Sequence, residues 1–431
     1  MIKKYFADYI LISQAASPPF IENGELIVDE TSGKILSVLK SNKKNYPSLE
    51  GSGDFRTIII PGFINSHTHT DLTIKPDDKT PRVFSKWVIS LMEKRKSFSP
   101  DKQNSLRIKA FKEFVKSGTT LIGDIIPIDS FYNINAPLLK TRLVPKVKGF
   151  IELRGLDPAR APEVLNEFKA FYKEYNDILR KNENYFSLGI SPHSVYSVSE
   201  ELFKGIIREN SRIGLKIAIH ASEHSAETRF ISGRGGNIAT NLLSAFNLSK
   251  FSKPLKTFSS PISYLDYLKI LNHNTSLIHA NEINDEDIEI IKKTGANIIH
   301  CPRSNAFFNS KKLPLKKILD RGITVSLGTD SLYSNKTLSI LDELRYAKKI
   351  HPDVSSKDLF AMATINGAKA LSFPNTTGTL EPNSYGDFTV FKIDKTMKVN
   401  EDNIYDNILS FKKTDIIKVV INGNVVYNKL N

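Results

Sequence analysis

The sequence predicts an α/β protein: a distorted (β/α)8 barrel of the TIM type, with a small β-sandwich domain formed by both chain termini. From about residue 57, eight short apolar runs typical of strands follow one another, with helical patterns between them. Nearly all chemically capable side chains fall at or just after the carboxyl ends of these runs, where parallel barrels keep their sites. A closed parallel barrel therefore fits the pattern better than an open doubly wound sheet.

The segments between the strand-like runs show the 3.6-residue period of helices with one buried face. In chain order the runs are Thr57–Ile64, Thr119–Gly123, Val147–Leu153, Ser187–Ser191, Leu215–Ile219, Thr275–Ile278, Ala296–Ile299 and Thr324–Leu327. The helical patterns are clearest at Ser105–Lys116, Ala161–Arg180, Glu200–Arg212, Asp285–Thr294 and Thr337–Lys349. Several of these patterns are followed by a glycine of the kind that ends helices, namely Gly118, Gly214, Gly295 and Gly322.

Both ends of the chain have a different pattern, with short alternating strands and turns such as Leu26–Val28 and Ile417–Ile421. Asn422-Gly423 is a strong hairpin signal. We therefore expect residues 1–56 and 376–431 to form the small β-sandwich domain and residues 57–375 to form the barrel.

Composition excludes several classes of protein. The chain has 431 residues, 40% hydrophobic and 25% charged, which is ordinary for a globular protein. No apolar run approaches the roughly 20 residues of a membrane-spanning helix, and Asp8 interrupts any signal-peptide core. A cytoplasmic protein without a membrane partner is expected. The single cysteine, Cys301, allows no internal disulfide and no thiolate metal cluster, and we expect it to be a packed thiol.

The formal net charge of +14 raises the question of nucleic acid. The lysines are spread along the chain among many acidic residues, and no basic block or aromatic-interleaved basic stripe stands out. No nucleic-acid partner is therefore expected. A clustered basic face on the structure would argue for one.

Four side chains at strand ends have the chemistry of a metal site. His67 and His69 are two residues apart at the end of the first run, so strand alternation directs both to the same side. His220 follows the fifth run and Asp330 the eighth. Three imidazoles and one carboxylate suit Zn²⁺ or Fe²⁺ and leave a position open for water.

Two further polar residues stand near these ligands in the expected barrel mouth. Glu223 comes three residues after His220 and can move a proton without binding the metal. His279 ends the sixth run and is a candidate to orient the attacking water or contact the attacked carbon. Either residue alone is explained as well by a buried, hydrogen-bonded polar group.

The order His-x-His, His-x-x-Glu, His, Asp resembles the amidohydrolase superfamily, in particular its mononuclear deaminase and chlorohydrolase branch. The resemblance covers nearly the whole chain. It includes the runs Pro61–His69 (PGFINSHTH), Ser191–Tyr196 (SPHSVY), Cys301–Asn305 (CPRSN), Gly328–Ser331 (GTDS) and Gly378–Pro382 (GTLEP).

The resemblance implies a metal-dependent hydrolase with one divalent ion, Zn²⁺ or Fe²⁺, bound by His67, His69, His220 and Asp330. Asp330 would also be catalytic, Glu223 would shuttle the proton and His279 would contact the water or the tetrahedral intermediate. The fourth strand ends near His193 and has no lysine there, which argues against a carbamylated lysine bridging two ions. Ammonia would be the leaving group.

The run His220–Glu227 followed by Phe230 and Gly233 resembles the subgroup that contains 6-amino-6-deoxyfutalosine deaminases of menaquinone synthesis. A 6-aminopurine nucleoside is then the implied substrate. Deaminases of S-adenosylhomocysteine or methylthioadenosine are close relatives, and guanine deamination and triazine dechlorination use the same metal site. A barrel that has lost catalysis and acts as a scaffold is a further alternative, but it predicts missing ligands.

In the nucleoside interpretation, His193 would touch the purine, Trp87 could cover it and Glu93 could bind ribose hydroxyls. Arg154, after the third strand, and Arg234 could pair with a substrate carboxylate. The resemblance also suggests a homodimer. Two features depart from the family pattern: the long segment 224–272, and Asn383 and Gly386 at the return to the β-domain.

Overall fold

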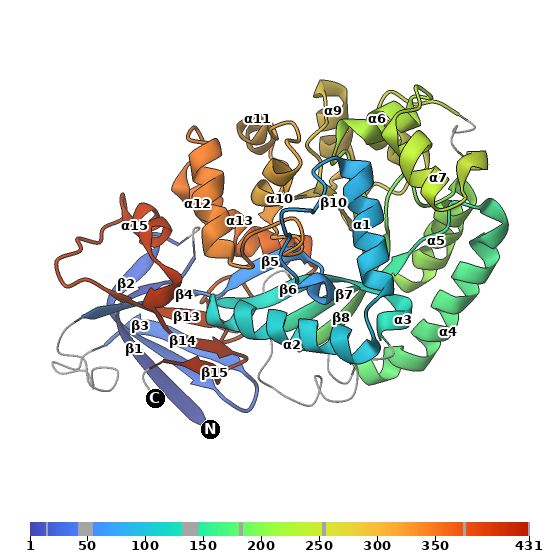
Figure 1. The fold of residues 1–431 in the computed structure, drawn as a ribbon. Coiled ribbons are helices and arrows are strands. Elements are labelled where there is room, and N and C mark those ends of the chain that lie inside the picture. The colour runs from blue at the N-terminus through green and yellow to red at the C-terminus, as the bar shows by residue number, and fades with distance from the viewer. Residues whose placement is uncertain are drawn as a thin grey trace.

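The computed structural model describes residues 1–13, 16–41, 55–131, 145–180, 184–251, 256–373 and 376–429. Within these ranges the strands form two sheets, one of eight strands and one of seven. Figure 1 shows the smaller body, built from both ends of the chain, beside the larger α/β body. The predicted fold class is confirmed, although residues 42–54 of the expected terminal domain lie outside the described residues.

The eight-stranded sheet is a parallel barrel whose strands follow one another in chain order. Its strands are β5 (Phe63–Thr68), β6 (Thr119–Pro127), β7 (Lys146–Leu153), β8 (Phe186–Pro192), β9 (Lys216–Ala221), β10 (Thr275–His279), β11 (Asn297–His300) and β12 (Val325–Leu327). Apolar side chains such as Ile64, Phe150 and Ile278 fill the interior, so the barrel is a packed core, and the predicted ligands lie at its carboxyl end.

The first and last strands meet just beyond β12, where the backbone N–H groups of Thr329 and Asp330 both donate to the carbonyl of His67, at 3.1 and 3.0 Å. Asn65 supports this junction, because its amide binds both the hydroxyl and the N–H of Thr329. Gly328 is needed here, since a Cβ would lie 2.9 Å from the Cβ of His67. The junction brings two predicted metal ligands, His67 and Asp330, side by side.

Helices cover the outside of the barrel and its carboxyl-end loops (Figure 1). They are α1 (Phe84–Lys96), α2 (Pro100–Lys116), α3 (Ile128–Phe131), α4 (Ala161–Arg180), α5 (Glu200–Ile213), α6 (Ser225–Ile231), α7 (Leu243–Ala245), α8 (Pro261–Tyr267), α9 (Asp285–Thr294), α10 (Pro302–Phe307), α11 (Leu315–Asp320), α12 (Ile340–Ile350), α13 (Ser356–Met362) and α14 (Ile365–Ala370), with the short turns η1 (Thr70–Leu72), η2 (Pro158–Arg160), η3 (Ile238–Leu242) and η4 (Ser249–Phe251). The bounds predicted for α4 and α9 are confirmed. Helix α2 begins five residues earlier than predicted because Ser99 caps it, and α12 begins three residues later because Ser339 caps it.

The seven-stranded sheet joins both termini in the order β15-β14-β13-β4-β1-β2-β3. Its elements are β1 (Ile2–Leu11), β2 (Phe20–Asp29), β3 (Lys34–Lys40), β4 (Arg56–Pro61), β13 (Phe388–Ile393), β14 (Ile416–Ile421) and β15 (Asn424–Asn428), with α15 (Ile404–Ser410) and η5 (Lys413–Asp415) beside them. The two ends of the sheet pack on each other, because Val28 of β2 lies against Gly423 and Tyr5 of β1 donates to the Gly423 carbonyl. The predicted hairpin at Asn422-Gly423 is confirmed, and both residues have positive φ.

One predicted strand was wrong. The run Thr57–Ile64 is divided between two sheets: β4 pairs with β1 and β13 in the terminal sheet, whereas β5 opens the barrel. The chain passes from one to the other at Gly62, where a Cβ would lie 2.2 Å from the Thr120 side chain. Residues 57–61 therefore belong to the terminal sheet, whereas the terminal segment was predicted to end at residue 56.

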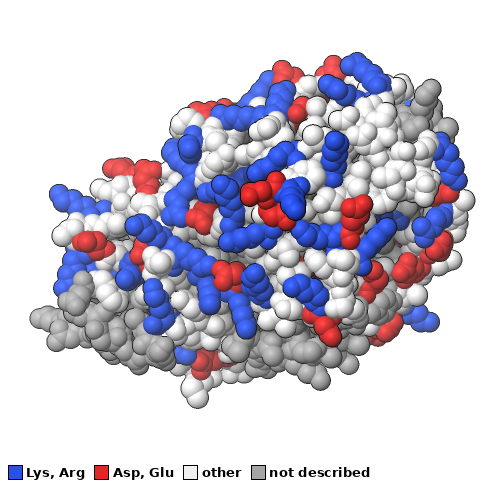
Figure 2. Space-filling view, viewed as in Figure 1, with Lys and Arg blue, Asp and Glu red and all other residues white. Residues whose placement is uncertain are grey.

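On the face seen in Figure 2, lysines and arginines gather across the centre, over α1 and α2, and acidic side chains lie among them. The exposed lysines of α2 include Lys109, Lys112 and Lys116, and Glu113 on the same helix pairs with Lys413. The expectation that nucleic acid is not a partner stays a prediction. Among the described residues, no helix has the length and apolar character that crossing a bilayer requires.

Candidate active site

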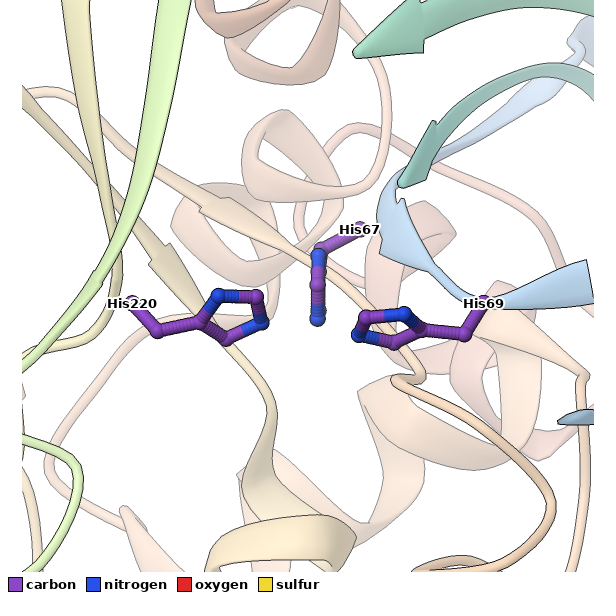
Figure 3. Close-up of side chains that lie close together, drawn as sticks. All are labelled: His67, His69 and His220. Carbon is purple, nitrogen blue, oxygen red and sulfur yellow. The ribbon is translucent and has the colours of Figure 1, made fainter. Parts of the chain in front are cut away.

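Three buried imidazoles meet at the carboxyl end of the barrel. His67 is the second-last residue of β5, His69 directly follows that strand, and His220 is the second-last residue of β9. One ring nitrogen from each can be chosen so that all lie within 4.8 Å of one another, and Figure 3 shows the rings directed at a common point. The Nε2 atom of His67 is buried without a hydrogen-bond partner. A buried imidazole nitrogen without a hydrogen-bond partner, close to two other imidazoles, fits a site that binds a cation.

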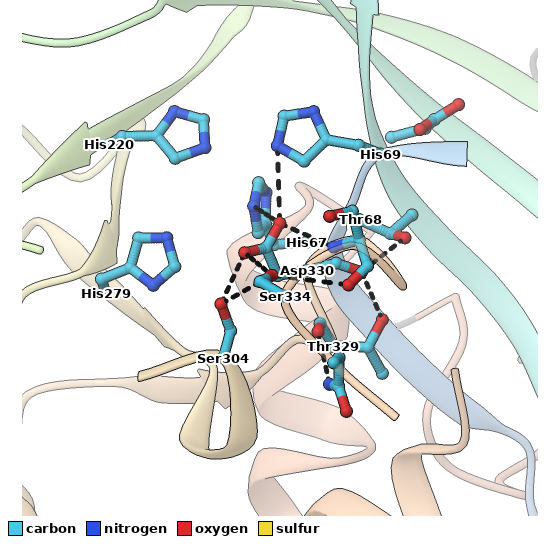
Figure 4. A network of polar contacts seen from close by, with 12 residues as sticks. His67, Thr68, His69, His220, His279, Ser304, Thr329, Asp330 and Ser334 are labelled. Atoms are coloured by element: carbon cyan, nitrogen blue, oxygen red, sulfur yellow. Dashed lines mark hydrogen bonds and ion pairs between the residues drawn. The ribbon is translucent and has the colours of Figure 1, made fainter. Parts of the chain in front are cut away.

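Asp330 completes this group from the other side of the barrel junction. Its Oδ1 lies 3.6 Å from Nε2 of His67 and 3.7 Å from Nε2 of His69. Its Oδ2 accepts hydrogen bonds from the hydroxyls of Ser304, at 2.6 Å, and Ser334, at 2.8 Å (Figure 4). The two serines therefore hold Oδ2, while Oδ1 accepts the backbone N–H of Ser331 at 2.6 Å and is the oxygen directed at the imidazoles.

The electrostatics of the group suit metal binding. Burial lowers the pKa of His220 to about 3, with the charges of His67 and His279 adding to the effect. Burial also lowers the pKa values of His67 and His69. For Asp330, burial acts in the opposite sense, but the neighbouring imidazoles, His67 foremost, outweigh it and hold the pKa of Asp330 well below its usual range. Neutral imidazoles beside an ionised carboxylate are the forms that bind Zn²⁺ or Fe²⁺.

His69, His220, Asp330, Glu223 and His279 line one cavity at this end of the barrel. In it, Oε1 of Glu223 lies 3.6 Å from Nε2 of His279. The backbone holds Glu223 firmly, because the carboxylate of Glu227 accepts its N–H at 2.7 Å and those of its two neighbours. Burial raises the pKa of Glu223 well above its usual value, and the negative charge of Asp330 adds to the effect. A carboxyl group with this pKa can carry a proton at neutral pH and donate it.

Left-handed backbone turns direct several of these side chains inward. Ser222 after β9, His279 and Ala280 at the end of β10, and Asp330 after β12 all have φ between 52 and 75°. Non-glycine residues adopt this conformation rarely, and where they do it is often at functional sites. The strand ends are thus bent at the points where they supply polar groups.

The structure brings three of the four predicted substrate-binding residues to the cavity. Trp87, Arg154 and His193 all line it, together with Phe84, Tyr196 and Ser331 among others. Trp87 is also fixed by packing, since its indole N–H donates to the Tyr333 carbonyl. His193 binds Ser197 through Nδ1 at 2.6 Å, and its carbonyl lies 3.1 Å from Nδ1 of His220.

Glu93 is the fourth predicted substrate-binding residue, and the structure does not bring it to the cavity. It is exposed on α1 and is absent from the cavity lining. The cavity face of α1 carries Trp87, Leu91 and Arg95, and at about 100° per residue Glu93 lies on the opposite face. Arg234 is exposed as well and lines none of the cavities found among the described residues.

Sequence reasoning missed Arg95 and Glu152, which form a buried ionic group with Arg154. Arg95 pairs with Asp71 at 2.6 Å and lies 3.6 Å from Glu152, which binds Arg154 at 2.8 Å. Burial alone would raise the pKa of Glu152, but Arg154 and Arg95 lower it to about 2. Glu152 lies near the end of β7, and Arg154 directly follows that strand. Because residues two apart on a strand point to the same side, the prediction for Arg154 could have been extended to Glu152.

A second, apolar chamber of about 260 Å³ adjoins the cavity and shares Met92, Arg154 and His193 with it. The far wall of the chamber comes from η3, α7 and the residues after them, and consists of Leu242, Leu243, Phe246 and Leu248. The long segment 224–272, whose role was open, therefore supplies part of the wall. Residues 252–255 of that segment lie outside the described residues.

Cys301, predicted to be a packed thiol, is buried in the barrel interior. Burial raises its pKa well above the usual value, and nearby carboxylates including Asp330 add to the effect. A thiol of this kind is a poor nucleophile at neutral pH.

Comparison with known proteins gives one family. A family model described as the amidohydrolase family matches residues 58–426. The chain is 25% identical over 434 residues to a 5-methylthioadenosine/S-adenosylhomocysteine deaminase of Thermodesulfovibrio yellowstonii, covering 96% of this chain and 91% of the relative.

Two solved structures share the fold. A crystal structure of Helicobacter pylori aminofutalosine deaminase in complex with methylthio-coformycin has a TM-score of 0.82 at 23% identity, covering 98% of this chain and 99% of that one. Guanine deaminase from C. acetobutylicum, with guanine bound, has a TM-score of 0.76 at 20% identity, covering 99% of this chain and all of that one. At these identities the likeness extends to the fold alone.

Proposed function

Because the chain belongs to the amidohydrolase family, we propose that it is a metal-dependent aminohydrolase that removes the 6-amino group of a purine nucleoside and releases ammonia. The observation that carries the proposal is the convergence of His67, His69, His220 and Asp330 with the facing pair Glu223 and His279. A non-catalytic scaffold would be expected to have lost ligands, whereas all four predicted ligands are present.

The donor set fits one divalent ion, with His67, His69, His220 and Asp330 as the residues that would hold it. When bound, such an ion makes a nucleophilic water available at neutral pH by lowering the pKa of that water to about 7. Asp330 accepts the proton of the attacking water through Oδ1, because Oδ1 faces the imidazoles and accepts only the N–H of Ser331 among the described residues, whereas Oδ2 accepts the hydroxyls of both Ser304 and Ser334.

Glu223 supplies the second proton transfer. Its carboxyl group protonates the ring nitrogen next to C6 as water adds to C6, which relieves the negative charge that would develop there. The proton then held by Asp330 passes to the amino group, and ammonia leaves as the carbonyl of the product forms. The proton released from the C6 hydroxyl in that step returns to Glu223, which restores its carboxyl group. His279 contacts the reacting atoms from the opposite side of the cavity, and Trp87 and His193 flank the base.

The adjoining chamber favours a particular class of nucleoside. A largely apolar space of about 260 Å³, whose charged lining residues are Arg154, Arg160 and Asp157 and which shares Arg154 with the cavity, suits a bulky apolar substituent that carries a carboxylate. 6-Amino-6-deoxyfutalosine, whose nucleoside carries a benzoate, has both features and is the substrate we favour. Methylthioadenosine would occupy the apolar chamber but leave Arg154 unused. S-adenosylhomocysteine would offer Arg154 a carboxylate, but it would also bring an ammonium group into a largely apolar space.

The names of the relatives favour a second candidate within the same reaction, deamination of methylthioadenosine or S-adenosylhomocysteine. Guanine deamination and triazine dechlorination would use the same ligands but need no chamber for a nucleoside substituent. Substrate choice therefore depends on the chamber rather than on the metal group.

A panel assay tests the proposal. Protein loaded separately with Zn²⁺ or Fe²⁺ is assayed for ammonia release from 6-amino-6-deoxyfutalosine, methylthioadenosine, S-adenosylhomocysteine, adenosine and guanine. We expect the highest kcat/KM on the first compound. In Glu223→Gln the rate should fall on the order of 10²–10⁴-fold with metal content unchanged, whereas Glu93→Gln, on the opposite face of α1, should match the parent. Ammonia release from none of the nucleosides would overturn the proposal.

A further inference from the structure

Behind His279, on the side away from Glu223, lies a buried cluster of amide and imidazole side chains formed by Asn281, His300 and Asn305. Nδ1 of His279 lies 2.9 Å from Oδ1 of Asn305. Nδ2 of Asn305 donates to Oδ1 of Asn281 at 2.8 Å and lies 3.2 Å from Nδ1 of His300. All three side chains are at most 5% exposed, so water does not compete freely for these bonds.

The direction of each hydrogen bond in the cluster follows from one backbone group. Nδ2 of Asn281 lies 3.3 Å from the carbonyl oxygen of Glu223, which can only accept. The oxygen of Asn281 must therefore face Asn305, and it requires the NH₂ group of Asn305 as its donor. Turning either amide over would set two acceptors against each other in a buried site.

Asn305 consequently presents its oxygen, and not its NH₂ group, to His279. An oxygen acceptor at 2.9 Å requires a proton on Nδ1 of the imidazole. A neutral imidazole with its proton on Nδ1 has a lone pair on Nε2, the atom that lies 3.6 Å from Oε1 of Glu223.

We infer that Asn305 is a positioning residue that holds His279 in the Nδ1-protonated tautomer, so that its Nε2 faces the reacting atoms as a hydrogen-bond acceptor. This inference rests on the proposed function for its catalytic meaning. It assigns His279 the role of accepting a hydrogen bond from the attacking water or from the Glu223 carboxyl, and excludes the neutral ring as a donor to the developing oxyanion.

The backbone makes such an anchor necessary. His279 and Ala280 both have positive φ, at 75 and 52°, so the ring projects from a strained strand end rather than from a regular strand position. A bond from Nδ1 to a fixed side chain sets the rotation of the ring as well as its tautomer. Asn305 can provide this bond because it lies in α10, directly after β11, where its own N–H binds the Cys301 carbonyl.

The tautomer can be measured directly by ¹⁵N NMR of histidine-labelled, zinc-loaded protein, which requires no turnover. The His279 signals, assigned by comparison with His279→Gln, should show the proton on Nδ1 in the parent protein. In Asn305→Leu, which removes the acceptor at similar volume, we expect a shift toward the Nε2-protonated form. In Asn305→Asp, which keeps an acceptor oxygen, the Nδ1-protonated form should remain.

Kinetics on whichever nucleoside is turned over give the second measurement. Asn305→Leu should lower kcat about 10- to 100-fold, as is typical when the partner of a site residue is lost, with KM within about threefold and zinc content unchanged. Asn305→Asp should recover a large part of kcat. The matched control is Asn210→Leu, because Asn210 is a buried asparagine of α5 whose side chain binds only the Leu215 backbone; it should lower stability and leave both measurements unchanged.

A proton on Nε2 of His279 in the parent protein would overturn the inference. So would equal losses of kcat in Asn305→Leu and Asn305→Asp with an unchanged tautomer, since these would indicate a structural role only. Should Asn305→Leu fail to fold, the parent protein and Asn305→Asp still decide the question. Failure of the proposed function would appear separately, as absence of ammonia release in the parent protein, and the NMR measurement would stand without it.

Discussion

The serine pair behind Asp330 can be tested without any knowledge of the substrate. Ser304 and Ser334 donate to the same carboxylate oxygen, at 2.6 and 2.8 Å, and to each other at 2.9 Å. A hydrogen bond to a charged group contributes about 1.5–3 kcal/mol, and loss of a partner of a metal-binding residue typically weakens metal binding about 10- to 100-fold. We therefore expect Ser304→Ala to weaken zinc binding about tenfold. The double variant with Ser334→Ala should approach a hundredfold loss, because Ser334 can no longer compensate.

The assay is competition for zinc against a chelating dye of known affinity, at one pH and one ionic strength. The matched control is Ser276→Ala, which removes a buried serine hydroxyl of the barrel that binds the Ala370 carbonyl instead of a carboxylate. Its zinc affinity should equal that of the parent protein. Unchanged zinc affinity in the double variant would refute the reasoning, because it would mean that the orientation of Asp330 has no part in holding the ion.

Three further predictions concern other parts of the barrel. Arg154→Met should raise KM for a carboxylate-bearing nucleoside about 10- to 100-fold and change that for methylthioadenosine far less, as steady-state kinetics on both will show. Burial, with the nearby charge of Lys148, lowers the pKa of Lys216 from 10.5 to about 7. The cost of burying the charged ammonium therefore lowers the free energy of unfolding in full below pH 7, and not at all above pH 10.5. Lys216→Met should therefore raise the free energy of unfolding by a few kcal/mol at pH 7, since each unit of pKa shift corresponds to about 1.4 kcal/mol. Denaturant titrations should show this gain shrinking from about pH 7 to 10, and a gain that grows with pH would contradict the prediction. Gly328→Ala should lower the free energy of unfolding by about 1–3 kcal/mol, because the added methyl would meet His67 at 2.9 Å; an unchanged melting temperature would contradict it.

The ligand group could be predicted because a parallel barrel gathers the carboxyl ends of its strands at one mouth. His67, His220 and Asp330 are distant in sequence, but each stands at the end of an apolar run, so the topology alone brings them together. Alternation within a strand then paired His67 with His69. Neither step requires knowledge of side-chain packing.

Residues outside this rule could not be placed in the same way. Glu93 was expected in the site because its type suits ribose, but helix rotation directs it to solvent and brings Arg95 to the cavity. The run Thr57–Ile64 resembled one strand because both halves are apolar. The break at Gly62 lies against Thr120 of β6, a strand that is far away in sequence but pairs with β5 in the barrel. Ser304 and Asn305 stood within a quoted motif, yet their partners Asp330 and His279 follow only from three-dimensional contacts.

The same distinction separates reaction from substrate. The positions of the proposed ligands and of Glu223 follow from the ends of the barrel strands. Those strand ends can be located from the hydrophobic pattern of the sequence. The chamber depends on η3, α7 and the loop after them, where a π-helical turn at Ile238–Leu242 follows no period that a sequence pattern reveals. Leu243 and Phe246 line the chamber but not the cavity that His69, His220 and Asp330 line, so we expect substitutions there to alter the space for the nucleoside substituent and leave the ligand atoms in place. If the proposed function is right, substrate preference can therefore change within this fold while the deamination chemistry is retained, and we expect the chamber wall to decide among the nucleosides.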